Sequence, residues 1–238
     1  MIKISSNTKR RDIPDHIKEG LAPFPVYQIK FMVCTFTFLM LDLVILLPLL
    51  FPVYKTVLFV TIPPMVFMSI WAVWLLLRKP ENTEMESLLF LGYIGIVGSF
   101  CYFVLTMKYH YMSGIQTPIY YIAMFIVYLA MIYYFVRNEH KKYSSLKEKQ
   151  AKQTPAWHYT VAAIGPGAGY IFAQYLMGLA PSMVLIIMSL VFFGISIVFM
   201  FILARGFHKY FFIKQNIQYA TFHNKRLKKK YKMTKVGS

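Results

Sequence analysis

The sequence is poor in charged residues, and above all in acidic ones. Only 15% of its 238 residues are charged, compared with about 25% in an average soluble domain, and just nine are Asp or Glu. Cysteine is scarce too. The two cysteines, Cys34 and Cys101, each lie inside a long apolar block, so we interpret them as packing residues. A disulfide-stapled scaffold is therefore not expected.

Signatures of catalysis and metal binding are missing as well. The sequence has no Gly-x-Ser-x-Gly, no His-Glu-x-x-His and no Walker-type glycine loop. None of the six histidines stands four residues from another, or beside a carboxylate within an apolar block. Glu81, Glu84 and Glu86 cluster after Pro80 in what we interpret as a solvated turn. We predict that the protein is not an enzyme and binds no cofactor or metal ion.

Long apolar blocks are the feature that the sequence does have. Hydrophobic residues make up 58% of the chain, and the mean hydropathy is +0.51. The blocks are about 20 residues long, the length that a helix needs to cross a ~30 Å hydrocarbon layer. We predict an all-α, polytopic membrane protein with six transmembrane helices; the alternative is four spans with two re-entrant hairpins. The expected spans are 31–50, 57–77, 88–107, 117–136, 157–177 and 182–204.

The basic residues alternate between the two sides of these spans. Twenty-four of the 26 Lys and Arg residues fall in the N-terminal arm 1–30, the connections 78–79 and 137–156, and the C-terminal tail 205–238. Only Lys55 and Lys108 fall on the opposite side. The positive-inside rule therefore places both termini in the cytoplasm. The opposite face is left with short connections at about 51–56, 108–116 and 179–181.

Asp42 is the one acidic residue inside an expected span. A charge at the bilayer centre costs about 2.5–3.5 kcal/mol, so we expect Asp42 to face the bundle interior or to be protonated. The functional interpretation is a proton or cation site, or a gate. The structural interpretation is a carboxyl group hydrogen-bonded to a neighbouring helix. Gln174 in the fifth span is a second intramembrane polar candidate, through an interhelical hydrogen bond.

Small residues and prolines mark the expected points of helix packing and kinking. Adjacent prolines should bend the second span, and one proline should interrupt the fifth. Small residues spaced by four allow helices to approach closely, and their positions lead us to expect spans three and five at the centre of the bundle. The residues assigned to packing or kinking are Pro63, Pro64, Gly95, Ser99, Gly165, Pro166, Gly169 and Ala173.

The C-terminal tail carries a dense basic run that we assign to contact with anionic lipid. Near an anionic leaflet, each Lys or Arg contributes about 1 kcal/mol. Contact with RNA at a membrane-docked ribosome is the alternative. The distribution of charge beside the spans favours the membrane, and no specific nucleic acid is expected. The residues assigned to lipid contact are Lys225, Arg226, Lys228, Lys229, Lys230 and Lys232.

These features favour a non-enzymatic, multi-pass membrane protein. We expect a subunit or accessory of a membrane-embedded assembly, such as one for secretion, export or toxin immunity. Its expected partners are the lipid bilayer with its anionic lipids, other membrane proteins and a further partner on the cytoplasmic face. The alternative is a small channel or transporter that uses Asp42 and the interrupted fifth span. Compactness and the steep charge asymmetry point to a bacterial plasma membrane.

Overall fold

The computed structural model of the chain describes residues 4, 11, 13–143, 174–175, 178 and 180–224. These residues form helices and connections, and no strand occurs among them. Five of the helices are long and apolar enough to cross a membrane. They correspond to five of the six expected spans. The remaining span, 157–177, lies outside the described residues except for Gln174 and Tyr175.

The first spanning helix is continuous from Val26 to Leu50 but changes its winding on the way. It consists of α2 (Val26–Cys34), a π-helical segment η2 (Thr35–Leu43) and α3 (Val44–Leu50). An extended residue, Phe51, ends the helix, and Pro52 follows it. Because proline lacks an N–H group, it cannot extend the helical hydrogen bonds.

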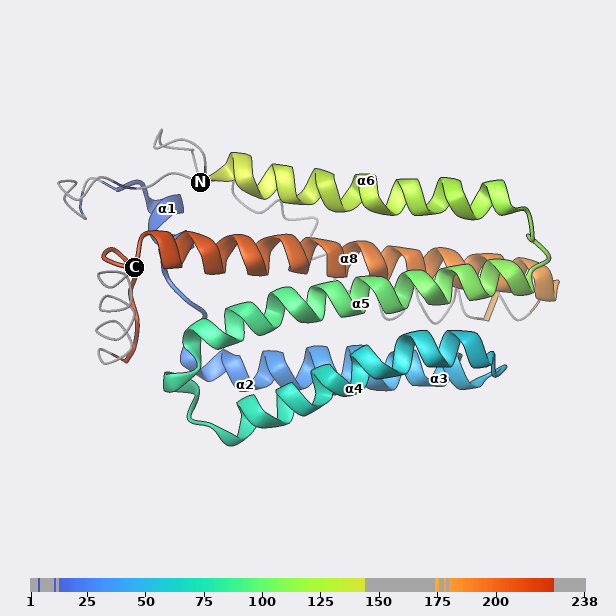
Figure 1. Cartoon of the computed structure of the whole chain (residues 1–238), viewed down its shortest axis with the longest axis horizontal. Coiled ribbons are helices and arrows are strands. Elements are labelled where there is room, and N and C mark those ends of the chain that lie inside the picture. The colour runs from blue at the N-terminus through green and yellow to red at the C-terminus, as the bar shows by residue number, and fades with distance from the viewer. Residues whose placement is uncertain are drawn as a thin grey trace.

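A hairpin turn leads from the first spanning helix to α4 (Lys55–Leu77), which runs back beside it (Figure 1). Pro63 and Pro64 lie within α4, and the helix continues through both. Neither proline can donate the helical hydrogen bond to the carbonyl four residues earlier. A short 3₁₀ helix, η3 (Pro80–Asn82), then connects α4 to α5 (Glu84–Met112).

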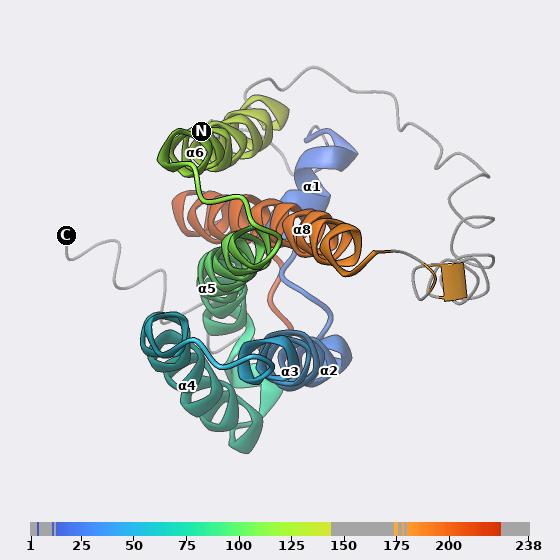
Figure 2. The same ribbon diagram turned by 90° about the vertical axis from the view of Figure 1, so that its right-hand side faces the viewer.

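The centre of the described bundle is the close contact between α5 and α8 (Pro181–Gln215) (Figure 2). Glycines bring the two backbones together. A Cβ atom added to Gly206 would lie 2.7 Å from the backbone nitrogen of Gly92, and one added to Gly95 would overlap the backbone of Leu203. Only a residue without a side chain fits at such positions. The third span thus packs on the sixth within the described part of the chain. The expected place of the fifth span beside the third at the centre of the bundle lies outside the described residues.

The remaining helices lie on opposite sides of this central pair, as Figure 1 shows. The first spanning helix and α4 pack on α5, while α6 (Pro118–Lys142) packs on α8. Tyr128 of α6 also reaches α5, where its hydroxyl lies 3.1 Å from Ser99 Oγ and its ring lies 4.4 Å from the ring of Phe103. The exposed residues of α6 are mostly large and apolar, as suits a surface that faces lipid.

One end of the bundle, which we call the inner end, gathers the segments that precede α2, connect α4 to α5 and follow α6 and α8. The backbone N–H of Ile4 donates to Asn216 Oδ1 at 2.8 Å, and Asn224 Nδ2 donates to Asn82 Oδ1 at 2.7 Å. The short helix α1 (Asp15–Leu21) packs on α8, with Gly20 against Tyr143. Burial raises the pKa of the Tyr143 phenol. The described parts of the segments predicted to be cytoplasmic therefore meet at one end of the bundle.

Candidate functional site

Asp42 forms the polar centre of a contact between the first spanning helix and α4. The hydroxyl oxygen of Ser69 lies 2.9 Å from Asp42 Oδ2 and 3.1 Å from Oδ1. The same hydroxyl lies 3.0 Å from the carbonyl oxygen of Met65, one turn earlier in α4. With a rise of about 1.5 Å per residue, Asp42 lies about 12 Å from Leu50 and Ser69 about 12 Å from Leu77, the nearest helix ends. In a membrane crossed by these two helices, both groups would therefore lie at hydrocarbon depth.

The π-helical winding of Thr35–Leu43 includes Asp42 itself. Winding of this kind is rare, and short π segments inside α-helices are frequent at functional sites. It widens the turn and shifts the direction in which the following side chains point. Two residues of the segment, Thr37 and Leu41, are fully buried, whereas Asp42 is only partly buried. The winding thus leaves the carboxyl group at the edge of the packed core.

The carboxyl and hydroxyl groups open into an apolar groove of about 480 Å³ on the outside of the described bundle. This volume falls within the ~300–1,000 Å³ range of ligand pockets. Its apolar walls come from both helices, and several of them are exposed; Val66 and Ile70 are 50% and 66% exposed. The groove is lined by Asp42, Leu46, Ile62, Met65, Val66, Ser69, Ile70 and Val73.

The hydrogen bonds between Asp42 and Ser69 can be arranged in two ways, according to whether Asp42 is ionised or protonated. A hydroxyl group has one proton to donate. If Asp42 is ionised, the Ser69 hydroxyl donates to its carboxylate. If Asp42 is protonated, the carboxyl group can donate to Ser69 Oγ, and the hydroxyl is then free to donate to the Met65 carbonyl. Ser69 therefore serves as donor or acceptor in the two states, and either state leaves acceptor positions of Asp42 directed at the groove.

Lys108 makes a second polar contact that the sequence did not predict. We expected it in the outer connection, but α5 continues to Met112 and Lys108 is buried within it. Its ammonium group donates to the carbonyl of Pro48 and, at 3.4 Å, to that of Leu49. The nitrogen also lies 5.7 Å from the ring centroids of Tyr54 and Tyr109. A cation at the carbonyl end of α3 complements the helix dipole.

His110 and Ser189 join α5 to α8 near the same end. Ser189 Oγ contacts His110 Nδ1 and lies 3.2 Å from the carbonyl oxygen of Thr106. The ring centroids of His110 and Tyr120 are 4.9 Å apart. Ser189 is fully buried and His110 only 5% exposed, so neither side chain is open to a substrate. The pair therefore functions as an interhelical hydrogen bond.

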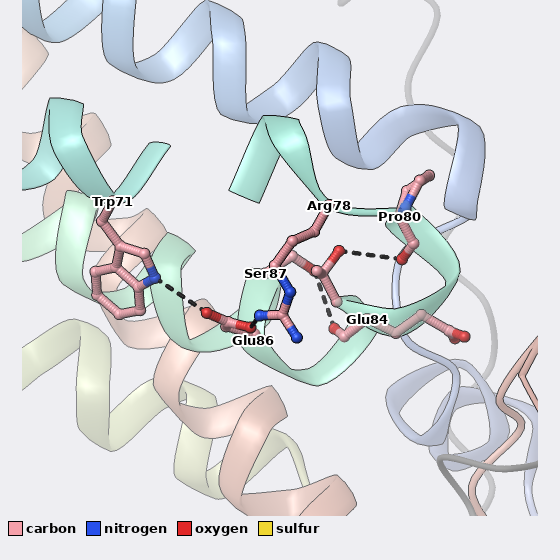
Figure 3. Close-up of polar contacts among 7 residues, drawn as sticks. Trp71, Arg78, Pro80, Glu84, Glu86 and Ser87 are labelled. Carbon is pink, nitrogen blue, oxygen red and sulfur yellow. Dashed lines mark hydrogen bonds and ion pairs between the residues drawn. The ribbon is translucent and has the colours of Figure 1, made fainter. Parts of the chain in front are cut away.

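The glutamates expected in a solvated turn are instead engaged in contacts, as Figure 3 shows for Glu86. Glu86 accepts from Trp71 Nε1 at 3.3 Å and forms an ion pair with Arg78, joining α4 to α5. Glu84 is 1% exposed, and its carboxylate accepts from the backbone N–H groups of His223 and Asn224 at 3.3 and 3.2 Å. The solvated-turn interpretation was wrong for Glu84, because the distant segment at His223 and Asn224 covers its carboxylate.

The residues assigned to packing fall into two groups. Gly95 and Ser99 lie at the contact of α5 with α8, where Ser196 Oγ also donates to the carbonyl of Ser99 at 2.8 Å.

Gln174, the second polar candidate, is exposed, and no hydrogen bond between described residues connects it to Asp42. The assigned residues of the fifth span, which lie outside the described residues, are Gly165, Pro166, Gly169 and Ala173.

Two further kinds of site were considered in the sequence, a metal site and a contact with lipid headgroups. In the described part of the chain, no group of three His, Cys, Asp or Glu side chains is arranged to hold a metal ion. The basic run assigned to anionic lipid, Lys225 to Lys232, lies outside that part. Glu84 accepts from the backbone of His223 and Asn224, the last two described residues of the C-terminal segment.

The sequence and fold were compared with protein-family models, with curated proteins and with solved structures, and none of them matches this chain.

Proposed function

We propose that this helical protein, whose apolar helices suit a membrane, is a non-enzymatic subunit or accessory of a membrane-embedded assembly. The observation that carries the proposal is the placement of Asp42. The one acid of the expected spans lies in a groove on the outside of the described bundle, not in its centre. A carboxyl group in contact with lipid is costly, so a protein surface that covers it lowers the free energy. Polar side chains at such positions stabilise contacts between transmembrane helices.

The orientation in the membrane belongs to the same proposal. The described parts of the four basic regions meet at the inner end, which supports a cytoplasmic placement of that end and of both termini. The other end offers Lys108, which is buried, and Lys55. A bacterial plasma membrane, anionic lipid contact by the tail and a cytoplasmic partner remain part of the proposal.

Affinity purification in gentle detergent tests the assembly. We expect the tagged protein, isolated from its own membranes, to retain a stoichiometric membrane partner that mass spectrometry identifies. With Asp42→Leu, the amount of copurified partner should fall at least about tenfold, because losing a contact worth about 1.4 kcal/mol changes a binding equilibrium tenfold. Leu43→Ala, a neighbouring change outside the groove, should retain it. A wild-type protein that is monodisperse without any partner would contradict the proposal.

A channel or transporter is the second candidate, and the two hydrogen-bond arrangements of Asp42 and Ser69 favour it specifically. A carboxyl group that can gain and lose a proton at hydrocarbon depth can act as a proton site. For a proton-coupled protein, wild type in liposomes should acidify the lumen under a pH gradient, as a trapped pH-sensitive dye reports. Asp42→Asn should abolish this flux. Equal flux in both proteins would reject the proton site.

A further inference from the structure

The acceptor capacity of Asp42 exceeds what the described residues supply. An ionised carboxylate offers about four lone-pair positions. Within the part of the chain that the structure describes, Ser69 is its one hydrogen-bond partner, and the single hydroxyl proton of Ser69 is shared with the Met65 carbonyl. When Asp42 is ionised, its partly satisfied carboxylate at hydrocarbon depth is stabilised by a further donor. That donor has to reach Asp42 from the groove.

In the part of the chain that the structure describes, no Lys or Arg side chain lines the groove. Lys108 is committed to the carbonyls at the end of α3. Lys55 begins α4 at the outer end, about 21 Å along the helix from Ser69. The sequence from Gln153 to Ala204, which contains the fifth and sixth expected spans, has neither Lys nor Arg. We therefore look to another molecule for a cation at the groove.

The dimensions of the groove fit one helix. Its lining along α4 runs from Ile62 to Val73, about 16 Å or three helical turns. Asp42 and Ser69 are its two polar residues, and the other walls are aliphatic or Met side chains. Lipid headgroups stay at the interface, whereas Asp42 lies about 12 Å inside the nearest helix end. An apolar transmembrane helix matches the length and the apolar walls of the groove, and it also reaches the depth of Asp42.

We propose that the groove receives a transmembrane helix of the partner protein, and that this helix carries a Lys or Arg side chain which donates to Asp42. The inference rests on the proposed function and names the chemistry of the partner. The cation neutralises the carboxylate and fills its open acceptor positions, while the flanking apolar residues of the partner cover Val66, Ile70 and Val73. An ion pair at this depth fixes the register of the two helices as well as their affinity.

Synthetic helices test this chemistry without knowledge of the partner. The probes are polyleucine helices of about 20 residues with a central Lys, a central Glu or neither. Association with the full-length protein in liposomes is measured by energy transfer between labels on the protein and on the probe. We expect the Lys helix to bind at least about tenfold more tightly than the all-Leu helix, and the Glu helix to show no such gain. Equal binding of the Lys and all-Leu helices would overturn the inference.

Three variants show whether the groove or merely an acid is responsible. Asp42→Leu should abolish the preference for Lys, and Asp42→Asn should retain a small part of it through its amide oxygen. The double variant Asp42→Leu with Leu43→Asp keeps an acid at the same depth but outside the groove. It should bind the Lys helix no better than Asp42→Leu does. Strong binding by this double variant would overturn the role of the groove.

The two proposals fail in different ways. If the Lys helix binds selectively but no native partner is purified, the cation-binding groove stands and the assembly is wrong. If a partner is purified but the Lys helix has no advantage over the all-Leu helix, the assembly stands and the inferred cation is wrong. Unfolding of each variant in detergent is followed by tryptophan fluorescence, and Asp42→Asn provides the comparison if Asp42→Leu loses its fold.

Discussion

Gly95→Leu should prevent stable folding of the bundle, with a loss of at least about 3 kcal/mol in the free energy of unfolding. The first side-chain carbon would already overlap the backbone of Leu203, and a backbone cannot move aside as a flexible side chain can. Because α5 and α8 form the centre on which the other described helices pack, separating them disturbs the whole bundle. Thermal unfolding in detergent and size-exclusion chromatography would measure the loss.

Gly194→Leu is the matched control for this substitution. Gly194 lies on α8 as well, but nothing lies within 4 Å of a Cβ atom added there. The variant should unfold within about 0.5 kcal/mol of wild type, as surface changes usually do. If Gly95→Leu unfolded at the same temperature as wild type, the close approach of α5 and α8 would be refuted.

Lys108→Met should lower the free energy of unfolding by about 2 kcal/mol. The change removes a charged donor and leaves the carbonyls of Pro48 and Leu49 without it, and a hydrogen bond to a charged group is worth about 1.5–3 kcal/mol. Methionine has a similar length, so it preserves most of the packing of the aliphatic stem. Unfolding with denaturant, followed by tryptophan fluorescence from α4, provides the measurement.

Lys55→Met tests whether the destabilisation by Lys108→Met comes merely from losing a positive charge on the side predicted to be non-cytoplasmic. Lys55 is the other basic residue assigned to the outer side, and it is exposed at the start of α4. Its replacement should change stability by less than about 0.5 kcal/mol. Equal destabilisation by the two substitutions would show that the buried contact of Lys108 contributes nothing of its own.

The existence of the spanning helices could be predicted from the sequence, because runs of about 20 apolar residues have few alternatives to a helix in lipid. The residues at which these helices begin and end could not be predicted. The third span was expected at 88–107, whereas α5 runs from Glu84 to Met112. The added residues include Glu84 and Lys108, whose partners, such as the carbonyl of Pro48 for Lys108, lie far away in the sequence. Tertiary contacts, not local composition, set these ends.

Asp42 could be selected as a candidate from the sequence alone, since an acid in an apolar block is rare. The residue that hydrogen-bonds to Asp42 could not be predicted in this way. A symmetric hairpin turning at 51–54 would bring Asp42 opposite Pro63, whereas the structure pairs it with Ser69, further toward the inner end. The π-helical winding and the offset of the two helices along their axes cause this shift, and neither leaves a mark in the hydropathy pattern.

The length of α8 has a mechanical consequence. Thirty-five residues at 1.5 Å each give a rod of about 52 Å, which exceeds a ~30 Å hydrocarbon layer by roughly 20 Å. The same rod holds α5 through Gly206 and ends at Gln215, and the next residue, Asn216, accepts a hydrogen bond from Ile4 of the N-terminal arm. Because α8 is continuous between these points, a force applied to Ile4 or to the end of α8 would be transmitted directly to the contact of α8 with α5.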